Sequence, residues 1–220
     1  MDIRDNALRQ ALKNVYFVSG TPCGGKSTIS RLLSERYGLL LYDADERFEA
    51  HRRLSDARLQ PAMNRRFEGA DDFFGRSAEE YAAWLEDSTR EQLDFVLLDL
   101  IRLSQGRRVV CDCHLSAEEA GRLTEPGRIV FLVKEPSRLL EDYCARPDHE
   151  GFARFLESAS DPARARATCR AALLRFNLPR YLAMKRSGYR CIDRNEGLSP
   201  EETLARVERA FGWQPSAETE

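Results

Sequence analysis

The residues best suited to chemistry in this chain are a lysine and a serine that follow a glycine-rich stretch. Lys26 and Ser27 come directly after Gly24 and Gly25, and Gly20 opens the stretch. A lysine ammonium here can reach the outer phosphates of a nucleoside triphosphate, and a serine hydroxyl can ligate Mg²⁺. Glycines let successive backbone N–H groups point into one turn, which suits an anion. The spacing predicts a phosphate-binding loop for ATP made of Gly20, Thr21, Pro22, Cys23, Gly24, Gly25, Lys26, Ser27 and Thr28.

The segments on either side of this loop support the same interpretation. Residues 15–19 form a short apolar run with β-branched and aromatic side chains, which is typical of a buried strand. Residues 29–37 place Ile29, Leu32 and Leu33 on one helical face. The start of a helix adds unpaired N–H groups and the positive end of its dipole. A chance match in a strand–turn–helix is the competing interpretation, but spacing, lysine-serine pair and both flanks all favour phosphate binding.

Three aspartates follow other predicted strands. Asp43 and Asp45 come after an apolar run at 39–42, and Asp112 lies at the end of a run at 108–113. The carboxyl ends of parallel strands share one edge of a sheet, so these side chains should lie on the same edge as the loop. An extended backbone would direct Asp43 and Asp45 to one side, where they could hold Mg²⁺ through water or accept a proton. The competing interpretation is that Asp45 caps the following helix.

Arginines supply the second group of candidates. Arg65 and Arg66 lie in an irregular segment, within a predicted substrate-side insertion at about 46–105, and could bind an anionic substrate group bidentately. A second arginine-rich region, at about 146–184, could form a mobile lid that closes positive charge over a transferring phosphoryl group. A solvated surface is the competing interpretation for any one of these arginines. Cys111, Cys113 and His114 do not have the spacing of a complete zinc site.

Composition narrows the class of protein. A length of 220 residues and a hydrophobic content of 42% suit one domain with a real core. A charged fraction of 32% with a net charge of −2 argues against a large nucleic-acid surface. We find no long apolar run and no signal-peptide pattern, so no membrane partner is expected. Six dispersed cysteines favour a reduced, cytoplasmic compartment. The oligomeric state, monomer or homodimer, stays open.

The remaining pattern alternates strands and helices. Apolar runs at 129–133 and 189–193 predict two further strands, and an amphipathic helix is expected at 2–14. Helices should begin at three capping boxes, whose first residues are Ser77, Ser116 and Ser199. Five strands alternating with helices predict a three-layer α/β/α sandwich around a parallel sheet, in a single domain covering residues 1–220.

At this level the chain resembles the small P-loop kinases of the nucleoside monophosphate kinase superfamily, and the shikimate kinase and gluconate kinase group in particular. The resemblance rests on the loop at 20–28, on the Asp-Ala-Asp at 43–45 and on Arg146-Pro147. It implies the strand order 2-3-1-4-5, a role for Asp43 in Mg²⁺ or base chemistry, contact of Asp45 with the substrate hydroxyl, and a lid arginine at Arg146.

The same comparison shows departures. The glycine triplet that shikimate kinases place after the third strand is replaced here by the stretch at 111–114, and the region between 45 and 108 is longer. These differences argue against shikimate as the acceptor.

The sequence therefore predicts an ATP-dependent kinase with Mg²⁺ as cofactor, acting on a small metabolite or a nucleotide. Lys26, Asp43 and Arg146 are the catalytic candidates, and Asp45, Arg65 and Arg66 the substrate-binding ones. The candidates for the metal are Ser27, Asp43 and Asp112. A nucleotide-hydrolysing switch is the alternative, although the chain has no guanine-specifying Asn-Lys-x-Asp run. A phosphotransferase acting on RNA ends or on an antibiotic is a further alternative.

Overall fold

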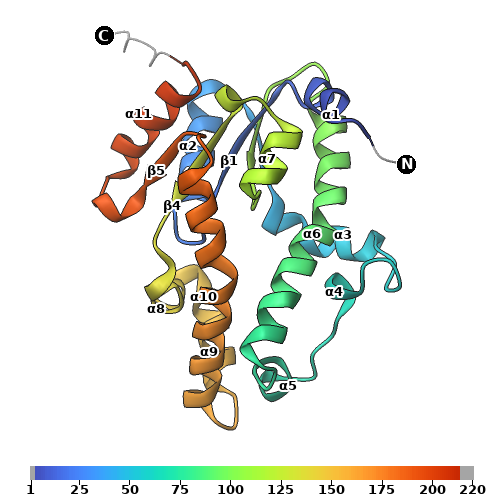
Figure 1. Ribbon diagram of the computed structural model, residues 1–220, viewed down its shortest axis with the longest axis vertical. Helices are drawn as coiled ribbons and strands as arrows, with labels where there is room; N and C mark the ends of the chain where they lie inside the picture. The colour runs from blue at the N-terminus through green and yellow to red at the C-terminus, as the bar shows by residue number, and fades with distance from the viewer. Residues whose placement is uncertain (1–2, 214–220) are drawn as a thin grey trace. The chain divides into compact units, whose positions relative to one another are not determined.

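The computed structural model describes residues 3–213, which divide into two compact units. The sheet unit contains residues 3–47, 96–134 and 181–213, and the helical unit contains residues 48–95 and 135–180. Three helices, α3, α6 and α10, have residues in both units. Figure 1 shows the elements of both, and each unit is described here by itself.

The sheet unit is built on a parallel sheet of five strands in the order β2-β3-β1-β4-β5, which confirms the predicted fold class. The strands are β1 (Val15–Gly20), β2 (Leu40–Asp43), β3 (Val109–Asp112), β4 (Ile129–Val133) and β5 (Cys191–Asp193). The register pairs Val18 with Asp112, Asp43 with Asp112, and Gly20 with Leu132. The pairing thus brings the ends of β1, β2 and β3 to one edge.

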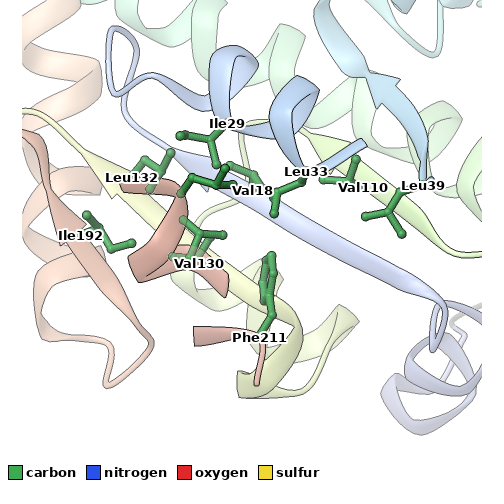
Figure 2. Packing of buried hydrophobic residues seen from close by; sticks show 11 residues of the cluster. Val18, Ile29, Leu33, Leu39, Val110, Val130, Leu132, Ile192 and Phe211 are labelled. Atoms are coloured by element: carbon green, nitrogen blue, oxygen red, sulfur yellow. The ribbon is translucent and has the colours of Figure 1, made fainter. Parts of the chain in front are cut away.

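Helices cover this sheet. They are α1 (Asp5–Ala11), α2 (Lys26–Tyr37), α7 (Ala117–Leu123) and α11 (Pro200–Ala210), with short 3-10 turns at Pro126–Arg128 and Arg194–Glu196. Figure 2 shows how one face is packed: strand residues such as Val18 and Val130 meet Ile29 and Leu33 of α2. Burying each such side chain contributes roughly 1.5–3 kcal/mol. This core fixes where α2 begins, and therefore where the glycine loop must lie.

The predicted helix starts are confirmed by hydrogen bonds. At each of the three capping boxes the serine hydroxyl accepts a backbone N–H three residues on, and the glutamate there accepts the serine N–H. Each cap stabilises its helix by about 1 kcal/mol. Some predicted bounds were too long: the helix expected at 2–14 is α1 (Asp5–Ala11), and β5 begins two residues later than expected. Residues 1–2 lie outside the described part of the chain.

The helical unit contains most of α3 (Ala44–Leu54), α6 (Ala78–Leu103) and α10 (Pro162–Arg186), with shorter helices between them. These are α4 (Pro61–Asn64), α5 (Ala70–Phe74), α8 (Leu139–Cys144) and α9 (Glu150–Glu157), with 3-10 turns at Pro136–Arg138 and Pro147–His149. No helix within residues 3–213 combines the length and the apolar character that crossing a membrane requires.

One hydrophobic core joins the parts of the helical unit. Phe74 of α5 packs against Phe155 of α9 with ring centroids 5.4 Å apart; Phe74 belongs to a buried cluster with Tyr81 and Leu156, and the partly buried Phe155 packs against that cluster. The Ser160 hydroxyl donates to Asp71 at 2.9 Å. Residues of the predicted substrate-side insertion and of the predicted lid therefore pack together. The pairing of 70–85 with 139–173 depends on contacts far apart in sequence, which local patterns do not show.

Candidate functional site

The glycine-rich loop joins the end of β1 to the start of α2. Gly20 has φ +136°, Cys23 has φ +58°, and Gly25 has φ +84° at the N-cap of α2. These left-handed conformations turn the chain back on itself, and the Gly24 N–H donates to the Thr21 carbonyl at 3.3 Å. The 12-residue helix α2 starts at Lys26, so its unpaired N–H groups open toward the loop. The loop has the local form that an anion-binding turn requires.

Strand β4 explains why glycine occupies two of the loop positions. A Cβ atom on Gly20 would lie 1.9 Å from the Leu132 carbonyl oxygen, and one on Gly24 would lie 2.4 Å from the same atom. The Thr21 N–H donates to that oxygen at 3.2 Å. The Thr21 hydroxyl accepts the Lys134 N–H at 2.7 Å and donates to the Lys134 carbonyl at 3.0 Å. The loop is therefore anchored to the end of β4 through backbone contacts that leave no room for a side chain.

Lys26 lies inside this arrangement. Its side chain is buried, with 8% of the residue exposed, and its ammonium donates to the Thr21 carbonyl at 3.4 Å. A buried ammonium needs partners, because removing a charge from water is costly. Lys26 is close enough to lower the pKa of Asp112. The structure thus places the predicted lysine and one predicted carboxylate in electrostatic contact.

Asp112 ends β3 and is also buried, with 5% exposed. Burial raises the pKa of its carboxyl, while the Lys26 ammonium and a hydrogen bond from the Ser27 hydroxyl lower that pKa and the Asp43 carboxylate raises it. Lys26, Ser27, Asp43 and Asp112 are therefore neighbours. They are the three residues predicted to bind the metal and the lysine predicted to be catalytic.

The two aspartates after β2 differ from the expectation. The strand ends at Asp43, and α3 begins at Ala44, so the backbone is helical rather than extended at Asp45. The Asp43 Oδ1 atom accepts the N–H groups of Asp45 at 2.9 Å and Glu46 at 3.3 Å. The competing interpretation, in which Asp45 caps the helix, was wrong, because Asp43 is the cap. Asp45 instead lies in the first turn, exposed, with its Oδ2 atom 3.4 Å from Nε2 of His114.

Three residues of this region were missed by sequence reasoning. The Ser19 hydroxyl donates to the Leu115 carbonyl at 3.1 Å and accepts the Leu115 N–H at 2.8 Å, which ties the segment after β3 to the end of β1. His114 lies in that segment. Arg194 follows β5, and its Nε atom lies 3.7 Å from the Cβ position of Gly25. The only signal for these residues was their place near the end of a strand or shortly after it, at the edge where ligands bind parallel sheets.

The other predicted residues belong to the helical unit. Arg65 lies over the ring of Phe67, with its guanidinium carbon 5.0 Å from the centroid, and Arg66 is exposed. Arg146 donates from Nε to Asp148 at 3.1 Å. Five arginines of the predicted lid pair with carboxylates of the same unit: Arg154 with Glu150, Arg166 with Glu157, Arg170 with Glu141, Arg175 with Glu79 and Arg180 with Glu86. A lid that closes over phosphates remains a prediction.

The protein atoms alone do not form a complete metal site. Within residues 3–213, no group of three or more His, Cys, Asp or Glu side chains is arranged to hold a metal ion. Mg²⁺ in phosphoryl-transfer sites needs only one or two protein oxygens, because phosphates and waters fill its other positions. The Ser27 hydroxyl and the Asp112 carboxylate, which are hydrogen-bonded to each other, fit that requirement. All six cysteines are thiols rather than disulfides.

Asp112→Asn is expected to stabilise the protein in metal-free buffer at pH 7 by on the order of 1 kcal/mol. The pKa of Asp112 is raised above its usual 3.8 in the folded chain. An acid with a raised pKa favours the folded state when protonated, so wild-type stability falls as pH rises from about 3.8 through the folded pKa. Thermal unfolding between pH 3 and 8 should show the two proteins converging at acid pH. A wild-type protein whose stability relative to the variant increases as pH rises would contradict this prediction.

Comparison with known proteins shows no family for this chain. No protein-family model and no curated protein matches the chain. Among solved structures it is similar to shikimate kinase from Bacteroides thetaiotaomicron, with 14% identity, a TM-score of 0.46, and coverage of 89% of this chain and 94% of that one. It is also similar to a protein of Chloroflexus aurantiacus described as a candidate kinase, with the same identity and TM-score and coverage of 89% and 97%.

Proposed function

We propose that this protein is an ATP-dependent phosphotransferase that moves the γ-phosphoryl group of ATP to a hydroxyl or phosphate group of a small metabolite or nucleotide. One observation carries the proposal. At the start of α2, after a loop with room only for glycine at positions 20 and 24, a buried lysine and a serine hydroxyl meet the buried carboxylate of Asp112. Lysine, hydroxyl and carboxylate in this arrangement are the groups that phosphoryl transfer uses.

On the nucleotide side, the roles follow from the contacts. The N–H groups of the loop and of the first turn of α2 bind phosphate oxygens, and Lys26 exchanges its weak bond to Thr21 for the outer phosphates. Ser27 and Asp112 are the residues that would hold Mg²⁺. When bound, Mg²⁺ neutralises charge on the phosphate oxygens. Asp112 lies next to the glycine loop because β3, which it ends, pairs directly with β1.

On the acceptor side, two carboxylates are available. Asp43 uses Oδ1 to cap α3, which orients its second oxygen. Asp45 is exposed and is held at one oxygen by His114, so it is placed to meet an acceptor hydroxyl and take its proton. We propose Asp45 as the general base and Asp43 as a residue that supports the metal. A role for Arg146 on the transferring phosphoryl group stays part of the proposal.

A phosphoryl-acceptor screen tests this function. The protein is incubated with γ-labelled ATP, Mg²⁺ and a panel of hydroxyl-bearing metabolites, nucleotides, aminoglycoside antibiotics and 5′-hydroxyl RNA. We expect label to pass to a small metabolite or nucleotide, with turnover well above the rate without acceptor. Rapid release of phosphate that no acceptor changes would instead identify a nucleotide-hydrolysing protein. Transfer only to RNA or to an antibiotic would contradict the proposed acceptor class.

A further inference from the structure

The helical unit contains a buried arginine whose charge no carboxylate contacts. Only 8% of Arg76 is exposed. Its Nε donates to the Phe73 carbonyl at 2.9 Å, but Nη1 and Nη2 are both buried without a hydrogen-bond partner. A guanidinium has five N–H donors, so four of them are unused here. Leaving buried donors of a charged group unpaired costs several kcal/mol in general, which makes this arrangement unusual.

Four aromatic rings surround the guanidinium. Its central carbon lies 4.4 Å from the ring centroids of Phe67 and Tyr81, 4.7 Å from that of Phe73 and 4.8 Å from that of Trp84. Such cation–π contacts stabilise the charge, each by about 0.5–2 kcal/mol. They act through the ring faces and do not satisfy N–H groups. The rings therefore hold Arg76 in place and keep water away while its Nη donors remain unused.

Nearby groups of both charges act on the Arg76 guanidinium without pairing with it. Burial lowers the pKa of Arg76, and so does the charge of Arg65, which lies over the same Phe67 ring at 5.0 Å, while Tyr81, Asp72 and Glu80 raise it. The two carboxylates that act on Arg76 hydrogen-bond to the backbone: Asp72 accepts the Glu68 N–H at 3.0 Å, and Glu80 accepts the Ser77 N–H at 2.9 Å. Within residues 3–213, neither arginine forms an ion pair. Two cations thus share one ring with no contacting anion.

The ring between the two arginines lies on a loop. Phe67 belongs to residues 65–67, which form neither helix nor strand, and its side chain is half-buried. The other three rings are fixed by α5 and α6, and Trp84 donates from Nε1 to the Ala62 carbonyl at 2.9 Å. An anion would reach the Nη atoms only if Phe67, which packs edge-on against Phe73 and Trp84, turned away from the cage. The three rings on the helices would then form the wall of a small site with the guanidinium at its base.

We propose that Arg76 and Arg65 form a binding site for a carboxylate or phosphate group. The planar guanidinium of Arg76 binds two oxygens of the anion through Nη1 and Nη2, and Arg65 adds a second positive charge at the entrance. All of its residues lie in the helical unit, outside the glycine loop and its aspartates. This proposal does not depend on whether the chain transfers phosphoryl groups. The anion is either free or one anionic group of a larger ligand.

Tryptophan fluorescence tests this site directly. The chain has two tryptophans, so W213F leaves Trp84, a wall of the cage, as the sole reporter. This protein is titrated with sodium phosphate, with sodium acetate and, as reference, with sodium chloride at equal ionic strength. We expect a saturable change with phosphate or acetate beyond the chloride reference. If phosphate saturates at a lower concentration than acetate, the site prefers a phosphate group; the reverse order indicates a carboxylate.

Variants in the W213F protein separate binding from packing. R76M is expected to lower the affinity for the anion at least about ten-fold. R76K keeps the charge but not the bidentate geometry, so it should lower the affinity less. R180M is the matched control, because Arg180 also lies over a ring, Phe176 at 5.0 Å, but pairs with Glu86. It should titrate like the parent. Circular dichroism establishes folding, and R76K carries the test if R76M is unfolded.

Three results would overturn the proposal. They are a Trp84 signal that follows chloride alone, an R76M or R76K protein that titrates like the parent, and a response that disappears when Lys26→Ala is added. The first two assign Arg76 to packing only, and the third assigns the response to the glycine loop. Retention of the anion response in the Lys26→Ala background supports the site, even if that background has no kinase activity to lose.

Discussion

Lys26→Ala is expected to lower the rate of phosphoryl transfer, as kcat/KM, at least about a hundred-fold, which corresponds to about 2.7 kcal/mol of transition-state stabilisation. Lys26 is a buried cation inside the loop and its ammonium has one weak hydrogen bond, to Thr21 at 3.4 Å. Removing it takes away the positive charge that the transferring phosphates need, and little that holds the fold. The assay is transfer from labelled ATP to the acceptor found in the screen.

Lys13→Ala is the control for this substitution, because Lys13 is exposed and lies outside the loop. It should retain the wild-type rate. Both variants should unfold within a few degrees of wild type. A Lys26→Ala protein with full transfer activity would contradict the proposed role, whereas one that loses activity together with its fold would require Lys26→Met to repeat the measurement.

Gly20→Ala is expected to lower the free energy of unfolding by about 3 kcal/mol or more. A Cβ atom at this position would lie 1.9 Å from the Leu132 carbonyl oxygen and 2.8 Å from the Leu132 nitrogen. Both are backbone atoms of β4, so neither can move aside without breaking the pairing of β1 with β4. The φ of +136° adds backbone strain for any residue with a side chain. Urea unfolding followed by circular dichroism measures the loss.

Gly127→Ala provides the matched comparison for that stability loss. Its Cβ would meet no atom within 4 Å, and the change should stay within about 0.5 kcal/mol of wild type. Equal stability of the Gly20→Ala and Gly127→Ala proteins would show that β4 does not hold the loop as closely as described.

Local patterns were enough to predict the glycine loop and the five strands. The loop depends on residues within nine consecutive positions, 20–28, whose types are required by the backbone turn itself. The strand order came from the resemblance to the small P-loop kinases, and the parallel pairing of all five strands confirms it. Capping boxes are equally local, since each needs only a serine and a glutamate three residues later.

The roles of Asp43 and Asp45 could not be settled in this way. Either residue can cap a helix, and the choice depends on where β2 stops. That point is set by pairing with β3, where Asp43 lies opposite Asp112. Sequence alone gives the two aspartates the same neighbours in the chain. The sequence does not show that β2 pairs with β3, some seventy residues further along the chain, and this pairing determines which aspartate begins the helix.

Arg76 was missed for a similar reason. It stands between Gly75 and Ser77, in a stretch that reads as an ordinary surface turn before a helix. Its burial depends on rings from α5, α6 and the loop before them, which the helical unit brings together. The arginines singled out at 146–180 show the reverse. They form a conspicuous cluster in the sequence, yet five of them are paired with nearby carboxylates.

Equilibrium binding of a non-hydrolysable ATP analogue tests the central claim most directly. Isothermal titration calorimetry with AMP-PNP and Mg²⁺ reports whether the loop at 20–28 grips a triphosphate, independently of any acceptor. We expect saturable binding of one nucleotide per chain by the wild type, and loss of that binding in folded Lys26→Ala. A folded wild-type protein that binds no nucleotide, or a Lys26→Ala protein that binds it with unchanged affinity, would contradict the account.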